Sequence, residues 1–262
     1  MSRKSLRTLY DEHSGKASDK WALFIGVYDR VLAPYRDRPI DFLEVGVQNG
    51  GSLEIWAKFF PEARSFVGCD IDPRCGDLVF DDPRIHVVVG PINDPGTYRE
   101  IAKHSAEFDV FIDDGSHTSP DIVSSFVNYF RFLRPGGTYL IEDLHCAYWP
   151  KWGGGMRQPA NAMGFLKLLA DGIHHQYWKD QASFTELAAP FFPPGVKVDA
   201  SLAAGIQSIT FHDSLCVIEK RAPGSGGRVG ERLIAGQEAS VKPAVLEARG
   251  EKFWVLTGDK LS

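Results

Sequence analysis

The chain has 262 residues, 44% of them hydrophobic, which is enough to bury one large core or two small ones. Its 34 Asp and Glu outnumber its 29 Lys and Arg, and the net charge of -5 argues against a nucleic-acid binder, which would usually carry a basic stripe. The start of the chain lacks the apolar core of a secretory signal, and no stretch approaches the roughly 18 apolar residues of a membrane span. The four scattered cysteines show no metal-binding spacing. We therefore expect a cytoplasmic chain without a membrane partner.

Helical and strand patterns alternate along the first half of the chain. The spacing of apolar residues predicts helices over residues 20–36, 52–60, 98–104 and 122–133, the second of them capped by Ser52. Short apolar runs predict buried strands over residues 40–45, 65–71, 85–89, 110–112 and 138–141. Strands that alternate with helices imply right-handed βαβ units and a mostly parallel sheet.

The pattern changes after the fifth strand. A helix is predicted over residues 165–177, and residues 206–211 and 215–219 are predicted to form a hairpin around His212-Asp213-Ser214. The fold class we expect is therefore α/β, with a Rossmann-like sheet that is mostly parallel and ends in a C-terminal antiparallel hairpin. Three segments are expected: a helical cap, the α/β domain, and a Gly- and Ala-rich linker with a tail, over residues 1–36, 37–221 and 222–262.

A glycine-containing loop follows the first strand, in the segment LEVGVQNGGS from Leu43 to Ser52. Glycines between a strand and a helix let the backbone turn sharply and approach a ligand closely. The acid before the first glycine would repel a pyrophosphate, whereas it suits the ammonium of a methionine moiety, so S-adenosylmethionine is the expected cofactor. The candidate cofactor-binding residues of this loop are Glu44, Gly46, Gly50 and Ser52. An ordinary strand-to-helix turn is the alternative interpretation of the loop alone.

The second strand ends in an acid, Asp70, that completes the expected cofactor site. A carboxylate at this place binds both hydroxyls of a ribose, and it follows the glycine loop by roughly 20 residues, as a nucleoside-binding crevice requires. Asp72 lies past the strand in an Asp-Pro turn and is assigned to the chemistry of that turn.

Acids also follow the fourth and fifth strands, as Asp113 and Asp114 and as Glu142 and Asp143. The carboxyl ends of adjacent parallel strands are where open α/β sheets bind ligands. Four carboxylates at one place repel one another, and a divalent cation such as Mg²⁺ relieves that repulsion. The sequence thus predicts a metal site from these four acids, although an Asp pair after a strand also serves as a helix cap and a solvated acid.

His117 comes three residues after Asp114, on the same turn. A neutral imidazole beside a metal-bound hydroxyl accepts its proton, so His117 is the predicted general base. The alternative is that His117 caps a helix or lies on the surface without a catalytic role.

These motifs resemble the macrocin and mycinamicin sugar O-methyltransferases, a family within the class I methyltransferases. The resemblance covers about residues 15–220 and is most specific in Asp113 to His117 and in Ile141 to Pro150. It implies a methyltransferase domain that uses S-adenosylmethionine and magnesium to methylate a sugar hydroxyl, with Asp114, Glu142 and Asp143 on the metal and His117 as base. Ser18-Asp19-Lys20-Trp21 resembles a Thr-Asp-Lys segment of the family, but the histidine that usually follows is missing.

Several functions remain open at this stage. The leading one is metal-dependent O-methylation of a sugar, a glycoside or a glycosylated natural product. Methylation of a catechol-type phenol uses similar chemistry, and a non-catalytic nucleoside-binding module would keep the crevice without needing a metal and a base. An NAD-linked oxidoreductase would show closer glycines and no Glu44. The sequence names neither the acceptor nor the oligomeric state, and a homo-oligomer is left open.

Overall fold

The computed structural model describes residues 3–178, 182–193, 198–199, 201–222 and 230–251. The chain divides into two compact units, Met1–Arg221 and Ala222–Ser262. The first unit contains the sheet and all the predicted site residues. In the second unit, the described part contains a 3₁₀ helix, η8 (Pro243–Ala248). The predicted linker and tail fall in this second unit, and residues 223–229 and 252–262 lie outside the described part.

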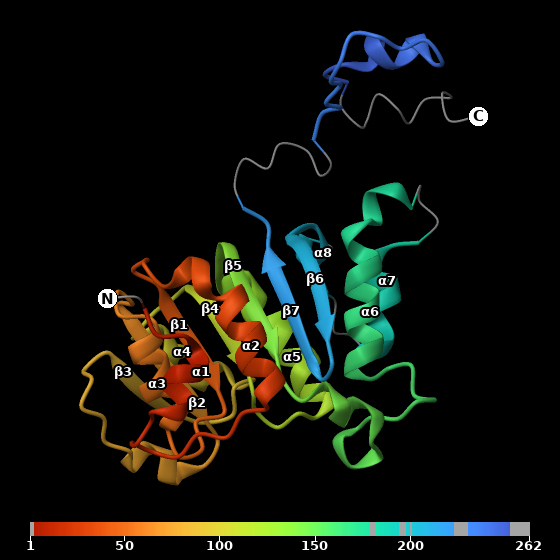
Figure 1. The fold of residues 1–262 in the computed structure, drawn as a ribbon. Coiled ribbons are helices and arrows are strands. Elements are labelled where there is room, and N and C mark those ends of the chain that lie inside the picture. The colour runs from red at the N-terminus through yellow and green to blue at the C-terminus, as the bar shows by residue number, and fades with distance from the viewer. Residues whose placement is uncertain (1–2, 179–181, 194–197, 200, 223–229, 252–262) are drawn as a thin grey trace. The chain divides into compact units, whose positions relative to one another are not determined.

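Seven strands lie side by side in one sheet in the order β3-β2-β1-β4-β5-β7-β6 (Figure 1). Their bounds are β1 (Asp41–Val45), β2 (Ser65–Asp70), β3 (Ile85–Val89), β4 (Phe108–Asp113), β5 (Leu133–Ile141), β6 (Ile206–His212) and β7 (Leu215–Lys220). The first five strands are parallel, whereas β7 pairs antiparallel with both β5 and β6. The predicted fold class is confirmed, including the C-terminal hairpin.

Eight α-helices are described, and the larger ones pack on the two faces of the sheet. Their bounds are α1 (Leu6–Asp11), α2 (Ala22–Val31), α3 (Gly51–Phe59), α4 (Pro95–Ala102), α5 (Ser119–Tyr129), α6 (Ala162–Ile173), α7 (Phe184–Ala188) and α8 (Ser201–Ala204). Short 3₁₀ segments join them: η1 (Ala33–Tyr35), η2 (Pro73–Asp77), η3 (Phe130–Phe132), η4 (Leu144–Tyr148), η5 (Pro150–Trp152), η6 (His175–Tyr177) and η7 (Ala189–Phe191).

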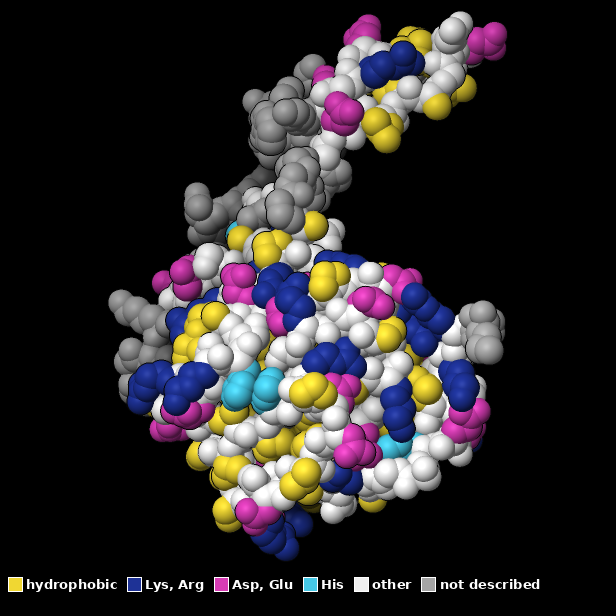
Figure 2. Space-filling view, turned by 90° about the vertical axis from the view of Figure 1, so that its left-hand side faces the viewer, with side chains coloured by type: hydrophobic (Ala, Val, Ile, Leu, Met, Phe, Trp, Pro, Cys, Tyr) yellow, Lys and Arg dark blue, Asp and Glu magenta, His cyan; other side chains and the backbone are white. Residues whose placement is uncertain are grey.

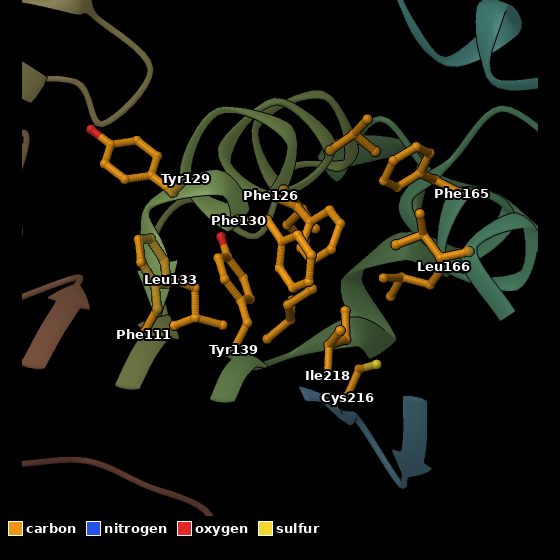
Figure 3. Packing of buried hydrophobic residues seen from close by; sticks show 14 of the residues in the cluster. Phe111, Phe126, Tyr129, Phe130, Leu133, Tyr139, Phe165, Leu166, Cys216 and Ile218 are labelled. Carbon is orange, nitrogen blue, oxygen red and sulfur yellow. The ribbon is translucent and has the colours of Figure 1, made fainter. Parts of the chain in front are cut away.

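The side chains of the strands contribute to two separate apolar clusters, one on each face of the sheet. On one face, helices α1, α2 and α3 pack around Phe42, Trp56 and Phe66. On the other, α5 and α6 cover Phe111 and Tyr139, whose rings stack with centroids 4.2 Å apart (Figure 3). The alternation has a period of two because successive side chains of a strand point to opposite faces. Both faces are buried, as a mostly parallel sheet requires.

The helix boundaries differ from expectation where backbone chemistry outweighs the apolar pattern. The α-helix predicted over residues 20–36 ends at Val31 and continues as the 3₁₀ segment η1, which contains Pro34 near its start. Proline cannot donate the hydrogen bond that a continuing α-helix needs. The expectation that Ser52 caps its helix is wrong: α3 begins at Gly51, with Gly50 at the cap in the left-handed region (φ 84°). Helix α1 was not predicted.

The surface of the first unit carries charges of both signs. On the face drawn in Figure 2, Lys and Arg side chains are interspersed with Asp and Glu. Such mixing gives no single-sign stripe on that face. Within the described part of the chain, no helix is both long enough and apolar enough to cross a membrane.

Candidate active site

The candidate site lies where β1, β2, β4 and β5 end. Backbone hydrogen bonds continue past the strands and tie their ends together: Gly46 donates to the Cys69 carbonyl (2.8 Å), Asp114 to the Val45 carbonyl (3.0 Å), and Glu142 to the Asp113 carbonyl (2.9 Å). The strand order reverses between β1 and β4, and this is the point at which open α/β sheets form a ligand crevice. A cavity of about 770 Å³ opens here, within the usual size range of a small-molecule site.

The β1–α3 loop forms one wall of this cavity. Gly46 has a φ of 92°, and a Cβ at this position would lie 2.0 Å from the Asp114 carbonyl oxygen. Only glycine therefore allows the first turn of the loop to pass so close to the end of β4. Gly46 and Ser52 line the cavity, whereas Gly50 caps α3 with its Cα facing Phe80.

Asp70 joins this loop to the end of β2. Its Oδ2 accepts hydrogen bonds from the backbone N–H groups of Val47 (2.8 Å) and Gln48 (2.9 Å), and its Oδ1 accepts one from Asp72 (2.9 Å). Asp70 also lines the cavity. Its carboxylate thus orders the loop from the place where a ribose-binding acid was expected.

Glu44 is placed differently from the other predicted cofactor residues. Its side chain is fully buried beneath α3, where the Ser52 hydroxyl donates to Oε2 (2.6 Å) and the Trp56 indole donates to Oε1 (3.2 Å). Burial raises the pKa of Glu44, against the lowering effects of Lys20 and of the Ser52 hydrogen bond. The Ser52 hydroxyl, expected to cap the helix backbone, is directed to this carboxylate instead.

Asp114, His117 and Asp143 form a group at the mouth of the site. One ligand atom from each lies within 4.8 Å of the others, and each side chain is about one fifth exposed, with values of 21%, 21% and 22%. His117 Nε2 is 3.8 Å from Asp114 Oδ1 and 3.6 Å from Asp143 Oδ2. Two carboxylates at this spacing fit the oxygen donors of a divalent cation such as Mg²⁺, and the imidazole lies beside them. We call these three residues the outer group.

The backbone holds two members of the outer group in an uncommon conformation. His117 has a φ of 55° and Asp143 a φ of 54°, both in the left-handed region. Residues other than glycine rarely adopt this region, and those that do are enriched at functional sites. The indole N–H of Trp21 donates to Asp143 Oδ1 (2.9 Å), so one oxygen of that carboxylate is fixed by a residue from before α2.

The other two predicted metal ligands, Asp113 and Glu142, lie deeper. Asp113 is 5% exposed, and burial raises its pKa to about 6, against hydrogen bonds that include one from Ser125. Glu142 is 2% exposed, and its Oε1 accepts hydrogen bonds from the Tyr28 hydroxyl (2.6 Å) and the Lys20 ammonium (2.7 Å). The structure thus brings Asp114 and Asp143 together with His117, while Asp113 and Glu142 line the same cavity from more buried positions.

Lys20 is the residue that sequence reasoning missed. Its side chain is 2% exposed, and its Nζ contacts Asp114 Oδ2, Glu142 Oε1 and Glu44 Oε1, the last at 3.4 Å. Burial by itself would lower the pKa of Lys20, but the three carboxylates raise it well above its usual value. The only signal was the Ser18-Asp19-Lys20-Trp21 segment, which gave no indication that it reaches strand ends more than 90 residues away.

Aromatic rings border the outer group on the side of β5. Trp21, His145, Trp149 and Trp152 follow one another with ring centroids 6.4, 4.9 and 5.4 Å apart. Trp21 and Trp149 are 61% and 46% exposed, which is unusual for such large apolar side chains. His145 is held from behind, because its Nδ1 lies 2.5 Å from the Ser214 hydroxyl in the hairpin turn. We call these four residues the aromatic border.

Comparison with known proteins agrees with this geometry. Residues 43–144, which include the glycine loop and the acids after β4 and β5, match a methyltransferase domain family. The sheet order and the C-terminal hairpin are those of the class I methyltransferase fold, and the chain has this fold.

The named relatives narrow the class, and the predicted resemblance to the macrocin and mycinamicin enzymes is confirmed. The chain is 35% identical over 221 residues to the 8-demethyl-8-alpha-L-rhamnosyl tetracenomycin-C 2'-O-methyltransferase of Streptomyces olivaceus, covering 80% of this chain and 54% of the relative. It is 38% identical to the demethylmacrocin O-methyltransferase of Streptomyces fradiae and 39% identical to the mycinamicin VI 2''-O-methyltransferase of Micromonospora griseorubida, each over 57% of this chain and 39% of the relative.

A solved structure extends the comparison to three dimensions. The MycE methyltransferase from the mycinamycin biosynthetic pathway, in complex with Mg, SAH and mycinamycin VI, superposes with a TM-score of 0.66 at 29% identity, covering 86% of this chain and 57% of that chain. The chain thus spans about half the length of the relatives it matches.

Proposed function

We propose that this chain is an S-adenosylmethionine- and divalent-metal-dependent O-methyltransferase that acts on a hydroxyl of a sugar, a glycoside or a glycosylated natural product. The observation that carries the proposal is the outer group, two carboxylates and a histidine, at the mouth of a nucleoside-sized cavity. The sugar-modifying relatives support the acceptor class. The acceptor and cofactors are small molecules handled by a cytoplasmic enzyme.

In this proposal, the cavity between β1 and β4 binds S-adenosylmethionine. Gly46 and Ser52 line the side of the cavity formed by the loop, and Asp70 lies where it can accept hydrogen bonds from the ribose hydroxyls. Glu44 and Gly50 act from behind the loop, Glu44 through Ser52 and Gly50 by capping α3. When bound, the cofactor supplies an electrophilic methyl group on a sulfonium.

The outer group performs the acid-base part of the proposed reaction. Asp114 and Asp143 would hold Mg²⁺, which when bound makes an acceptor hydroxyl easier to deprotonate. His117 faces both carboxylates and accepts the proton of that hydroxyl. The deprotonated oxygen would then bond to the methyl carbon in line, as the carbon–sulfur bond of the sulfonium breaks and S-adenosylhomocysteine leaves. Asp113 and Glu142 line the same cavity with low exposure.

The aromatic border is the proposed contact surface for the acceptor. Rings stack on the apolar C–H faces of sugars and equally on aromatic rings, so the border by itself fits a glycoside or a phenol. The relatives favour the glycoside, because the name of the Streptomyces olivaceus enzyme includes a rhamnosyl group.

Ligand-induced stabilisation and an acceptor panel test the proposal. S-adenosylhomocysteine should raise the Tm and NAD should not, since a ligand that binds only the folded state stabilises it. Methyl transfer to a panel of rhamnosides, other glycosides and catechols, followed by mass, should show glycoside products that disappear with EDTA and return with Mg²⁺. Stabilisation by NAD alone, or full turnover in chelator, would overturn the proposal. Catechol products alone would show that the acceptor is a phenol and not a glycoside.

A further inference from the structure

The turn that carries His117 lies between two anchored ends. Before it, the Asp114 N–H donates to the Val45 carbonyl (3.0 Å), which ties the turn to β1. After it, the Ile122 N–H donates to the Thr118 carbonyl (3.0 Å) in the first turn of α5. His117 itself has a left-handed φ of 55°, a conformation that residues other than glycine keep only where their surroundings hold it. The turn therefore needs a support between its two ends.

Asp121 supplies that support from the first turn of α5. Its Oδ2 accepts hydrogen bonds from the hydroxyls of both residues that flank His117, Ser116 (2.6 Å) and Thr118 (2.9 Å). The Thr118 N–H also donates to the Ser116 hydroxyl oxygen (3.3 Å). One carboxylate oxygen thus joins the residue before His117 to the residue after it.

Ordinary helix capping does not account for this arrangement. Thr118 is the N-cap of α5, and its hydroxyl oxygen accepts from the Asp121 N–H (3.4 Å). In a capping box, the side chain three residues later accepts in turn from the N–H of the cap residue, as Glu186 does from Ser183 in α7 (3.2 Å). Asp121 has the same place in α5, but its carboxylate binds the two hydroxyls, and the Thr118 N–H is left to Ser116.

We infer that Asp121 is a positioning residue for the proposed base: through the two flanking hydroxyls it holds His117 in its left-handed conformation, with the imidazole turned toward the carboxylates of the outer group. The inference rests on the proposed function and deepens it, because it makes the proton transfer depend on a side chain outside the outer group. Asp121 also lines the cavity, so direct contact with the cofactor is the competing role that the experiments must separate.

A double-mutant cycle tests whether Asp121 acts through His117. Asp121→Ala removes both hydrogen bonds, and kcat on a glycoside of the acceptor panel should fall about tenfold or more, since a misplacement of about 1 Å costs up to about a hundredfold. The KM for that glycoside and the Kd for S-adenosylhomocysteine should stay within about threefold of the wild type, because only the base is displaced. In a His117→Asn background the same substitution should lower kcat by less than about twofold, since the positioned group is already gone.

Two results of this cycle would overturn the inference. An equal loss of kcat in both backgrounds would mean that Asp121 does not act through His117. A Kd for S-adenosylhomocysteine weakened about tenfold in Asp121→Ala would make Asp121 a cofactor contact.

Two further variants separate position from charge and from helix capping. Asp121→Asn loses the charge but keeps an oxygen that can accept from both hydroxyls, so its kcat should stay within about threefold of the wild type. Glu186→Ala is the matched capping control: it removes the corresponding residue of the α7 capping box, so it should lower the Tm and leave kcat unchanged. If Asp121→Asn is as slow as Asp121→Ala, or if Asp121→Ala is as fast as Glu186→Ala, the positioning role is wrong.

Failure of the proposed function is visible separately. Near-normal kcat in His117→Asn alone would remove the base itself, whatever the Asp121 variants show. A slow His117→Asn beside a normal Asp121→Ala would leave the base in place and overturn only the role of Asp121. If Asp121→Ala does not fold, Ser116→Ala decides by the same cycle, because it removes one of the two hydrogen bonds and leaves the Thr118 cap in place. An unchanged kcat in Ser116→Ala would then overturn the inference.

Discussion

We call Glu44, Glu142 and Lys20 the inner group; it lies at the same strand ends as the outer group, yet the two groups differ in exposure and in partners. The inner glutamates are 0% and 2% exposed and accept hydrogen bonds from a lysine, a tyrosine, a serine and a tryptophan of the chain itself. The outer side chains are 21% to 22% exposed, and two of them have a left-handed backbone. A carboxylate with internal partners contributes to stability, and a carboxylate with a free oxygen is available to a ligand. Substitutions should therefore separate into two kinds of effect.

The largest effect is expected at His117, on turnover alone. His117→Asn keeps a residue that tolerates the positive φ of this position, and it removes the proposed base. General-base catalysis typically contributes 10²- to 10⁴-fold, so turnover should fall about a hundredfold or more. The Tm and the affinity for S-adenosylhomocysteine should stay close to those of the wild type, because the side chain is at the mouth of the site and one fifth exposed. A stable variant with near-normal turnover would remove His117 from the mechanism.

Tyr28→Phe should have the opposite profile. The Tyr28 hydroxyl is buried and donates to Glu142 at 2.6 Å, and a hydrogen bond to a charged group contributes about 1.5 to 3 kcal/mol. Burial raises the pKa of Glu142 to about 8, so urea unfolding above that pH, where the carboxyl is charged, should show a loss of about 2 kcal/mol.

Tyr35→Phe is the matched control for that measurement. The Tyr35 hydroxyl is also largely buried, but it donates to a neutral carbonyl, that of Gly136, at 2.7 Å. Its loss should cost about 1 kcal/mol, the usual contribution of a neutral hydrogen bond. If Tyr28→Phe is no more destabilising than Tyr35→Phe, the inner group does not hold a charged carboxylate and the contrast between the groups is lost.

The sheet and the outer group were largely predictable from local sequence. Apolar runs such as 85–89 coincide with a strand, and acids that directly follow parallel strands must meet at one edge of the sheet. The inner group was not predictable, because its members are joined across the chain: 122 residues separate Lys20 from Glu142. Nothing local distinguishes Glu142, which is 2% exposed and accepts a hydrogen bond from Lys20, from its neighbour Asp143, which is 22% exposed, although both line the cavity. Asp143 has a left-handed backbone, which the sequence does not reveal.

The smallest effect is expected at Glu54, which anchors the segment that carries Lys20. Its Oε1 accepts from the Lys16 ammonium (2.8 Å) and its Oε2 from the Lys16 backbone (3.0 Å). Burial alone would raise the pKa of Glu54, but these hydrogen bonds lower it below the usual value of 4.5. A carboxyl whose pKa is lowered by folding contributes stability above its unfolded pKa and loses it as the pH falls through the folded pKa. Glu54→Gln should therefore cost about 1 kcal/mol at pH 7, as measured by urea unfolding.

The pH dependence of that cost shows whether the anchor is electrostatic. The difference between wild type and Glu54→Gln should shrink as the pH falls below about 4.5, because protonated Glu54 and glutamine then carry the same charge. Glu100→Gln is the control: Glu100 pairs with Lys103 on the surface, with side chains 56% and 65% exposed, and its loss should cost less than about 0.5 kcal/mol. A Glu54→Gln cost that does not change with pH would mean that packing, and not the charge of Glu54, docks the segment through which Lys20 reaches the inner group.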